Sequence, residues 1–343
     1  MIARAALTGG YTVSRLIKGG WHLAGGHGAI DREAAKGDMA RFVDAGITTF
    51  DCADIYTGVE ELIGDFRRDY PEHARRVQVH TKFVPDLDRL ADIDRVHVEA
   101  IIDRSLTRLR VETLDLVQFH WWDYEVPRYV DTALELDRLR RAGKIANIAV
   151  TNFDVPHLAE LVAAGVPVVA HQLQQSVLDD RPARGMGEFC ATHGIGLLCY
   201  GTVAGGFLSE RWLAVDEPDG PLSNRSLVKY KLIIDDFGGW SRFQRLLRVL
   251  AAIGARHGCD IATVATCHTL SRPQVAAAIV GATSSRHLPA HEKLASVHLE
   301  HTDLAAIDEV LAGRSGPQGD VYELERDRNG PHGRIMKYNL SAS

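Results

Sequence analysis

The feature that most constrains this chain is a regular alternation of short β-branched runs with longer amphipathic segments. Parallel strands joined by crossover helices give this pattern, which indicates an α/β protein. The runs expected to form strands are residues 15–18, 47–51, 77–82, 114–119, 145–151, 168–172, 196–200 and 275–280. Because open sheets usually have fewer strands, this number favours a closed (β/α)8 barrel, the TIM barrel.

Several segments between these runs carry apolar residues at helical spacing. In one of them, Ile101, Leu106 and Leu109 mark a single face. The expected helices are residues 31–45, 94–109, 130–141, 156–164, 184–193, 240–256 and 260–270.

Two regions break the alternation. Residues 205–239 are rich in Gly, Pro, Asp and Ser and are too long for an ordinary connection, so we expect a loop after the seventh strand that serves as a lid. Residues 313–343 are polar and glycine-rich, and we expect a tail that is either extended over the barrel or partly disordered. The predicted organisation is one barrel domain at residues 1–312 followed by this tail.

The charge and cysteine content narrow the classes of partner. A formal net charge of -6 gives no reason to expect nucleic acid or an anionic membrane, because those partners require clustered Lys and Arg. We therefore expect a small-molecule substrate, with monomer and homo-oligomer both open. The five cysteines are widely spaced and no apolar signal-peptide core is visible, so we expect reduced thiols in the cytoplasm. No ligand spacing indicates a metal site.

Polar residues end three successive expected strands: Asp51, Lys82 and His120. Polar groups at the C-terminal ends of barrel strands converge on one mouth. Tyr56 follows Asp51 on the next loop. Each residue alone has an ordinary explanation as a cap, a solvated strand end or packing, but their joint occurrence favours a functional site. A cation close to Tyr56 would lower its pKa from about 10 and make it a proton donor near neutral pH.

Several motifs in order make the chain similar to the aldo-keto reductase superfamily over residues 16–311. They are Phe50-Asp51-Cys52-Ala53 with Tyr56, Thr81-Lys82, Asp115-Leu116-Val117-Gln118-Phe119-His120-Trp121, Gly143-Lys144-Ile145, Val150-Thr151-Asn152-Phe153, Gln172, Tyr200-Gly201-Thr202-Val203 and Val280-Gly281-Ala282-Thr283. The resemblance implies a (β/α)8 barrel that reduces aldehydes and ketones with a nicotinamide cofactor, usually NADPH. The spacing G-x-G-x-x-G is missing, so a Rossmann dinucleotide fold is not expected.

The resemblance also implies roles for single residues. Tyr56 matches the general acid, Lys82 and Asp51 tune and orient it, and His120 matches the histidine that polarises the carbonyl. The expected cofactor-binding residues are Gly20, Trp21, Asp51, Thr151, Asn152, Gln172, Tyr200, Gly201, Thr202, Val203, Gly205, Gly206, Gly281, Thr283, Ser284, Ser285, Arg286, His287 and His291. The expected substrate-contacting residues are Trp21, His22, Tyr56, His120, Trp121 and Trp122.

Among the expected cofactor-binding residues, four match positions that hold the nicotinamide. The resemblance assigns the carboxamide to Thr151, Asn152 and Gln172, and stacking on the ring to Tyr200. Turn capping and strand-end solvation are the ordinary alternatives for Asn152 and Gln172.

The chain departs from the superfamily's pattern after its last expected strand. Residues 281–283 replace a basic start seen in strongly NADPH-selective members, and His287 lies where an arginine often meets the 2′-phosphate. Ser284, Ser285 and Arg286 can still form a phosphate site at a helix N-terminus, although the serines could simply cap the helix. Because an arginine remains, NADP is the expected cofactor and NAD is the alternative.

Three functions follow from this interpretation. The first is an NAD(P)H-dependent reductase that interconverts an aldehyde or ketone and its alcohol. The second is an NAD-preferring dehydrogenase of a sugar or secondary alcohol. The third is a cofactor-binding regulatory subunit like the potassium-channel β-subunits, which are a branch of the superfamily that the chain resembles.

Overall fold

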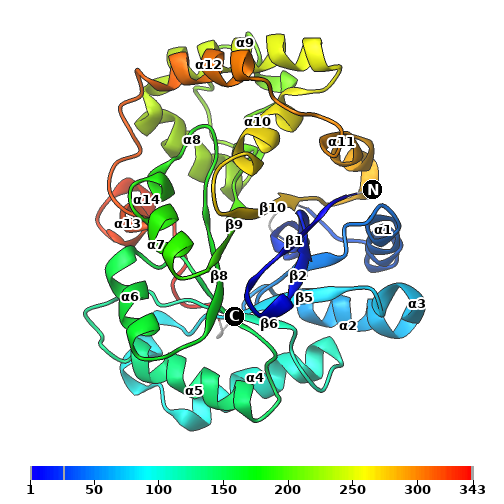
Figure 1. Cartoon of the computed structure of the whole chain (residues 1–343), viewed down its shortest axis with the longest axis vertical. Coiled ribbons are helices and arrows are strands. Elements are labelled where there is room, and N and C mark those ends of the chain that lie inside the picture. Colours follow the sequence, from blue (N-terminus) through cyan, green and yellow to red (C-terminus); the bar gives the residue numbers. More distant parts are fainter. Residues whose placement is uncertain (1, 26–27, 341–343) are drawn as a thin grey trace.

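Eight parallel strands close into a barrel in which β10 pairs with both β3 and β9 (Figure 1). The computed structural model describes residues 2–25 and 28–340. The barrel strands are β3 (Leu16–Gly19), β4 (Thr49–Asp51), β5 (Gln78–Phe83), β6 (Leu116–Phe119), β7 (Ile148–Thr151), β8 (Val168–Gln174), β9 (Gly196–Tyr200) and β10 (Val275–Gly281). Each overlaps a run expected to form a strand, so the predicted (β/α)8 barrel is confirmed.

Helices surround the barrel, and side-chain caps fix several of their starts. Asp31, Asp94, Asp154 and Asp260 each accept a hydrogen bond from a backbone N–H in the first turn of the following helix. The helices are α1 (Arg32–Asp44), α2 (Val59–Asp69), α3 (Pro71–Ala74), α4 (Arg95–Leu109), α5 (Tyr129–Arg141), α6 (Val155–Ala163), α7 (Met186–Thr192), α8 (Arg225–Phe237), α9 (Gly239–His257), α10 (Ile261–Leu270), α11 (Leu288–Leu294), α12 (His301–Leu311), α13 (Glu323–Arg326) and α14 (Pro331–Arg334).

The predicted loop at residues 205–239 is wrong over much of its length, because α8 lies within it. Asn224 caps α8 by accepting a hydrogen bond from the N–H of Leu227. Leu227, Ile234 and Phe237 are among its buried residues, so one face packs into a core beside α9. The turn-forming composition of the preceding residues obscured this apolar stripe.

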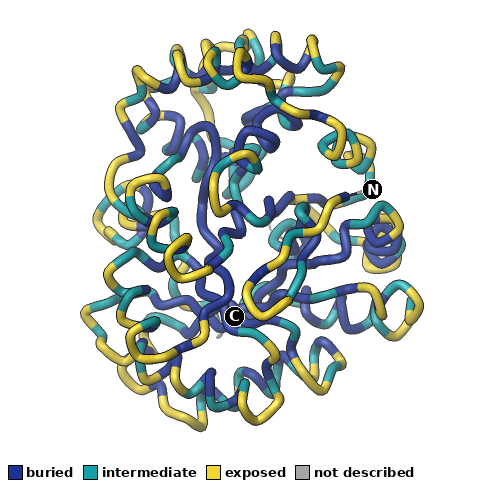
Figure 2. Tube along the Cα trace, in the orientation of Figure 1, coloured by how far each residue is buried: buried dark blue, intermediate teal, exposed yellow. Residues whose placement is uncertain are grey.

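The barrel interior is narrow and apolar towards its N-terminal end. Ile17, Leu116 and Leu198 belong to a core cluster that also includes Leu7 and Val13 of the N-terminal segment. An antiparallel hairpin of β1 (Arg4–Ala6) and β2 (Thr12–Ser14) ends directly before β3, and it therefore lies at this end of the barrel. Figure 2 shows the barrel strands buried and the outer helix surfaces exposed. Polar chemistry is thus left to the opposite, C-terminal mouth.

The tail after α12 packs onto the barrel. It contains α13 and α14, so the expected extended or disordered path misses two short helices. Val321, Tyr322, Glu325 and His332 are all buried, and His332 Nε2 lies 2.7 Å from a carboxylate oxygen of Asp236 in α8. The division into a domain at residues 1–312 and a tail at 313–343 stays a prediction.

Candidate active site

A buried ion pair joins the ends of β4 and β5 at the mouth. Lys82 Nζ lies 2.9 and 2.8 Å from the two carboxylate oxygens of Asp51 and donates a further hydrogen bond of 2.9 Å to the carbonyl oxygen of Cys52. Both side chains are buried, with exposed fractions of 6% for Lys82 and 5% for Asp51. Burial opposes the charge on Lys82, but Asp51 and Tyr56 outweigh it and raise the pKa of the ammonium. The lysine is therefore a fixed cation.

Two glutamines complete the shell of Asp51. The amide nitrogens of Gln118 and Gln172 lie 2.8 and 2.6 Å from Asp51 Oδ1. Gln172 also donates to the side-chain oxygen of Gln118 at 2.6 Å. Gln118 was not among the predicted site residues, although a polar residue inside the apolar strand β6 was the available signal. Gln172 was expected to hold a cofactor, but in this structure its amide orients Asp51.

Tyr56 lies on the turn after β4, beside the ion pair. Lys82 Nζ is 5.1 Å from the centroid of the Tyr56 ring, and the ring of Trp21 meets it edge-on at 5.1 Å. Burial raises the pKa of Tyr56 above its ordinary value, and the nearby ammonium of Lys82 only partly offsets this. The expectation of a pKa lowered towards neutrality is therefore wrong here. Tyr56 stays protonated and remains able to donate.

His120 follows β6 and is 2% exposed. Its Nδ1 lies 3.1 Å from the carbonyl oxygen of Thr151, which can only accept a hydrogen bond. Burial and then the cation of Arg326 lower the pKa of His120 to about 3, so the ring is neutral. The proton therefore resides on Nδ1, and Nε2 carries a lone pair. The predicted role of His120 as a donor to the carbonyl does not fit this tautomer.

Two aromatic rings, those of Trp122 and Tyr322, lie against the ring of His120. Both meet it edge-on, and the ring centroid of His120 lies 4.3 Å from that of Trp122 and 5.6 Å from that of Tyr322 in the tail. Trp121 was predicted to contact substrate, but it is fully buried in the core, and its indole N–H donates to two backbone carbonyls. Its place in the predicted substrate wall is therefore wrong. Trp21, His22 and Trp122 are half-buried.

The ends of β7 and β9 meet beside these rings. Asn152 adopts a left-handed backbone with φ of 62°, and its side-chain oxygen accepts a hydrogen bond of 2.8 Å from the Tyr200 hydroxyl. Lys229 of α8 places its ammonium 5.1 Å from the Tyr200 ring centroid. Tyr200 is half-buried.

The turn after β9 packs against α8. It contains Gly201, Thr202, Val203, Gly205 and Gly206. A Cβ atom at Gly205 would lie 2.8 Å from the ring of Tyr230, and one at Gly201 would lie 2.5 Å from its hydroxyl. Two further glycines also allow close approach. A Cβ at Gly20 would lie 2.7 Å from the Asp51 carbonyl oxygen, and one at Gly281 would collide with the His22 imidazole.

The segment after β10 is more open. The Ser285 hydroxyl donates to Asp38 at 2.6 Å, and Arg41 pairs with the same carboxylate at 2.8 Å. Arg286 donates to the His287 ring at 2.8 Å, and both side chains are exposed. Thr283 is exposed, whereas Ser284 and His291 are half-buried. Asp38 and Arg41 were not predicted, because nothing in the sequence of α1 indicates that it adjoins residues near position 285.

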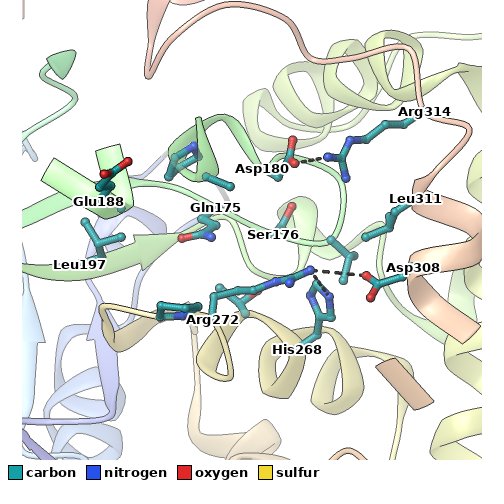
Figure 3. Close-up of a pocket in the computed structure, with 16 residues that line it drawn as sticks. Gln175, Ser176, Asp180, Glu188, Leu197, His268, Arg272, Asp308, Leu311 and Arg314 are labelled. Atoms are coloured by element: carbon teal, nitrogen blue, oxygen red, sulfur yellow. Dashed lines mark hydrogen bonds and ion pairs between the residues drawn. The ribbon is translucent and has the colours of Figure 1, made fainter. Parts of the chain in front are cut away.

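A cavity of about 440 Å³ lies away from these residues, between α7, α10 and α12 (Figure 3). Its two arginines are already engaged. Arg314 pairs with Asp180, while Arg272 donates to the His268 ring at 2.9 Å and lies 3.7 Å from Asp308. The residues that line this flank cavity include none of the residues described above at the mouth.

Neither a metal-binding cluster nor a membrane-spanning helix is present in the part of the chain that the structure describes. Among residues 2–25 and 28–340, no group of His, Cys, Asp and Glu side chains could hold a metal ion. Across the same described residues, no helix is long and apolar enough to cross a membrane.

A sequence model described as the Aldo/keto reductase family matches residues 15–312. The chain belongs to this family. Its members are NAD(P)-dependent oxidoreductases. The recognition made from the sequence motifs is confirmed.

Three known proteins illustrate the relation of this aldo/keto reductase to others. Flagellar radial spoke protein 5 of Chlamydomonas reinhardtii is 28% identical over 62% of the chain, which spans about half of that protein, 47%. The NADH-specific methylglyoxal reductase of Escherichia coli (strain K12) is 23% identical, covering 87% of the chain and 95% of the relative. A solved glycerol dehydrogenase of Gluconobacter oxydans superposes with a TM-score of 0.76 at 21% identity, covering 92% and 97% of the two chains.

The mouth of this aldo/keto reductase offers groups suited to a nicotinamide dinucleotide. An aromatic ring such as that of Tyr200 can stack on a nicotinamide, and arginines such as Arg41 and Arg286 are of the kind that bind phosphate. Glycines at 281 and 205 leave no space for a side chain. The residues present therefore fit such a cofactor, although Asn152 and Gln172 are already bonded to protein groups.

Proposed function

We propose that this aldo/keto reductase reduces an aldehyde or ketone to its alcohol, with Tyr56 as the proton donor. The observation that carries the proposal is the position of the Tyr56 ring, 5.1 Å from a buried ammonium that is held by Asp51. A nicotinamide cofactor supplies the hydride when bound. The substrate class beyond a carbonyl or alcohol is left open.

The charges around Tyr56 suit a proton transfer to a developing alkoxide. As the hydroxyl of Tyr56 gives up its proton, the phenolate that forms is stabilised by the ammonium of Lys82. Asp51 keeps that ammonium charged and in place, and Gln118 and Gln172 keep Asp51 from turning away. A preplaced cation needs no reorganisation when the charge develops, which lowers the barrier.

Replacement of Tyr56 by Phe tests this role. We expect carbonyl reduction to fall by about 10²- to 10⁴-fold, since a positioned general acid contributes that much. The Kd for NADPH or NADH, measured by the quenching of tryptophan fluorescence, should stay near the wild-type value. Tyr70→Phe is the matched control, because Tyr70 stacks on Phe66 away from the ion pair. Wild-type turnover by Tyr56→Phe on a carbonyl panel would remove Tyr56 from the mechanism.

The second part of the proposal concerns the phosphate end of the cofactor. We propose that Ser285, Arg286 and Arg41 face the adenosine phosphates, with NADP favoured and NAD as the alternative. Asp38 beside Ser285 would repel a 2′-phosphate, but Arg41 neutralises it. An NADH-specific relative is consistent with the alternative.

Replacing Arg286 with Ala separates the two cofactors. We expect the Kd for NADPH to rise about 10- to 150-fold, because a charge-assisted contact is worth roughly 1.5 to 3 kcal/mol, while the Kd for NADH changes little. Arg41→Ala provides the comparison from α1. An equal effect of Arg286→Ala on both cofactors would exclude this arginine from a 2′-phosphate site.

One observation favours a second function, oxidation of an alcohol. The lone pair on His120 Nε2 can accept a hydrogen bond from an alcohol hydroxyl but cannot donate one to a carbonyl. Steady-state rates measured in both directions with NAD and NADP decide between the two. The regulatory-subunit interpretation stays a prediction.

A further inference from the structure

One arginine of the tail, Arg326, binds the backbone directly after β6, next to His120, and directly after β7. Arg326 Nη1 lies 2.6 and 3.0 Å from the carbonyl oxygens of Trp121 and Trp122. Its Nη2 lies 2.7 Å from the Tyr124 hydroxyl and 2.7 Å from the carbonyl oxygen of Asn152. The guanidinium also lies over the Tyr124 ring, 4.1 Å from its centroid. A planar fork with several donors can bind these acceptors together, whereas a lysine cannot.

These acceptors are direct neighbours of the atoms that set the His120 tautomer. Trp121 follows His120 after β6, and Asn152 follows Thr151 at the end of β7. The contact of 3.1 Å between His120 Nδ1 and the Thr151 carbonyl bridges the same two strand ends. A change in the spacing of these ends would therefore change this contact first.

The tail has an anchor that is independent of Arg326. The neighbouring Glu325 is fully buried and accepts hydrogen bonds of 3.0 and 3.3 Å from Arg181. Lys229 approaches the same carboxylate at 3.5 Å. Because α13 is held by these ions, loss of the Arg326 side chain should leave the tail in place.

We propose that Arg326 is a positioning residue that acts through His120, holding the ends of β6 and β7 so that Nδ1 donates to Thr151 and Nε2 presents a lone pair. The inference rests on the proposed function only where it predicts a loss of turnover. The predicted change in the His120 tautomer does not depend on that function.

The electrostatic surroundings of His120 agree with this role. The charged groups that face it are Arg326 from α13 and Lys82 from β5, and the rings of Trp122 and Tyr322 enclose it. Both cations disfavour a second proton on the ring, so the neutral form with the proton on Nδ1 is retained. Arg326 thus contributes by geometry and by charge, and these two effects are separable.

Two substitutions separate them. Arg326→Lys keeps the charge but loses the fork, and Arg326→Met loses both. Arg328→Met is the matched control, because Arg328 lies in the same segment, is exposed, and pairs with Asp123 at 3.1 Å. Nitrogen NMR of ¹⁵N-histidine-labelled protein reports the tautomer, with His120→Gln identifying the signal. Thermal unfolding checks that each variant is folded.

In wild type and in Arg328→Met, we expect the nitrogen shifts of a ring protonated on Nδ1. In Arg326→Lys and Arg326→Met, the two nitrogens should shift towards averaged values, and in Arg326→Met the ring should also take up a proton at higher pH. Turnover should fall about 10²-fold in both variants, as misplacement by about 1 Å can cause, while cofactor Kd stays unchanged. Wild-type nitrogen shifts in both Arg326 variants would overturn the inference, even if activity were lost. Absence of turnover in wild type would instead overturn the proposed function and leave the NMR comparison valid.

Discussion

Two buried ion clusters near the mouth differ in what their charges face. In the first, Lys82 binds Asp51 and lies beside the ring of Tyr56. In the second, Arg181 binds Asp179 and the tail residue Glu325, and all three side chains are at most 1% exposed. Burial and pairing are common to both. Lys82 lies beside the ring of Tyr56, whose hydroxyl can lose its proton, whereas the side-chain hydrogen bonds of Arg181 go to carboxylates.

This difference shows that buried ion pairs do not by themselves mark an active site. The side chain of Arg181 donates hydrogen bonds to the carboxylates of Asp179 and Glu325, so its charge is balanced within the fold. Lys82 has the second role of stabilising charge that appears only during a reaction. We therefore expect loss of the first cluster to affect rate most, and loss of the second to affect stability most.

Lys82→Met should show the largest effect. Turnover should fall by about 10²- to 10⁴-fold, because the phenolate of Tyr56 loses its cation and Asp51 loses its partner. Steady-state kinetics on the best carbonyl substrate measure this. Lys144→Met is the control, since Lys144 also binds two carboxylates, at 2.9 and 2.7 Å, but lies between surface helices. A similar loss in both variants would contradict the distinction.

Glu325→Gln should act mainly on folding. Removing one charge from a buried cluster leaves Arg181 and Lys229 less well compensated, and we expect the free energy of unfolding to fall by roughly 3 kcal/mol. Urea unfolding followed by circular dichroism measures it. Glu323→Gln, on the exposed side of the same short helix, should change stability by less than about 0.5 kcal/mol. If Glu325→Gln instead kept full stability but lost turnover, the second cluster would be part of the reaction.

The pH dependence of that stability should give the smallest effect. Burial raises the pKa of Glu325, but the charges of Arg181 and Lys229 and the hydrogen bonds from Arg181 together outweigh burial and lower this pKa from 4.5 to about 2. The stabilisation is therefore complete above about pH 4.5 and is lost as the pH falls towards 2. Between pH 4.5 and 3, the difference in unfolding free energy between wild type and Glu325→Gln should shrink by about 2 kcal/mol. A difference independent of pH would show that Glu325 is not ionised in the fold.

The sequence predicts the first cluster far better than the second. Asp51 and Lys82 end successive strands, and in a parallel barrel neighbouring strand ends must meet, so their contact follows from topology. Glu325 and Arg181 share no such relation, because they are 144 residues apart and one lies in an irregular tail. Nothing in local periodicity specifies where such a tail docks.

Properties that depend on the surroundings of a side chain were also beyond the sequence. The rise in the pKa of Tyr56 comes from burial, which outweighs the visible effect of a nearby lysine. The tautomer of His120 depends on one backbone carbonyl, that of Thr151, whose direction no residue type reveals. The helix α8 was hidden because the turn-forming residues before it masked an apolar stripe that becomes meaningful only against α9.

The docking of α13 has a consequence for the order in which the protein is made. Arg326 binds carbonyls that precede it in the chain by 174 and 205 residues. A ribosome has therefore released every barrel strand before the residue that fixes the ends of β6 and β7 is synthesised. A nascent chain therefore holds the ion pair of Lys82 and Asp51 before it holds the arginine that binds the ends of β6 and β7.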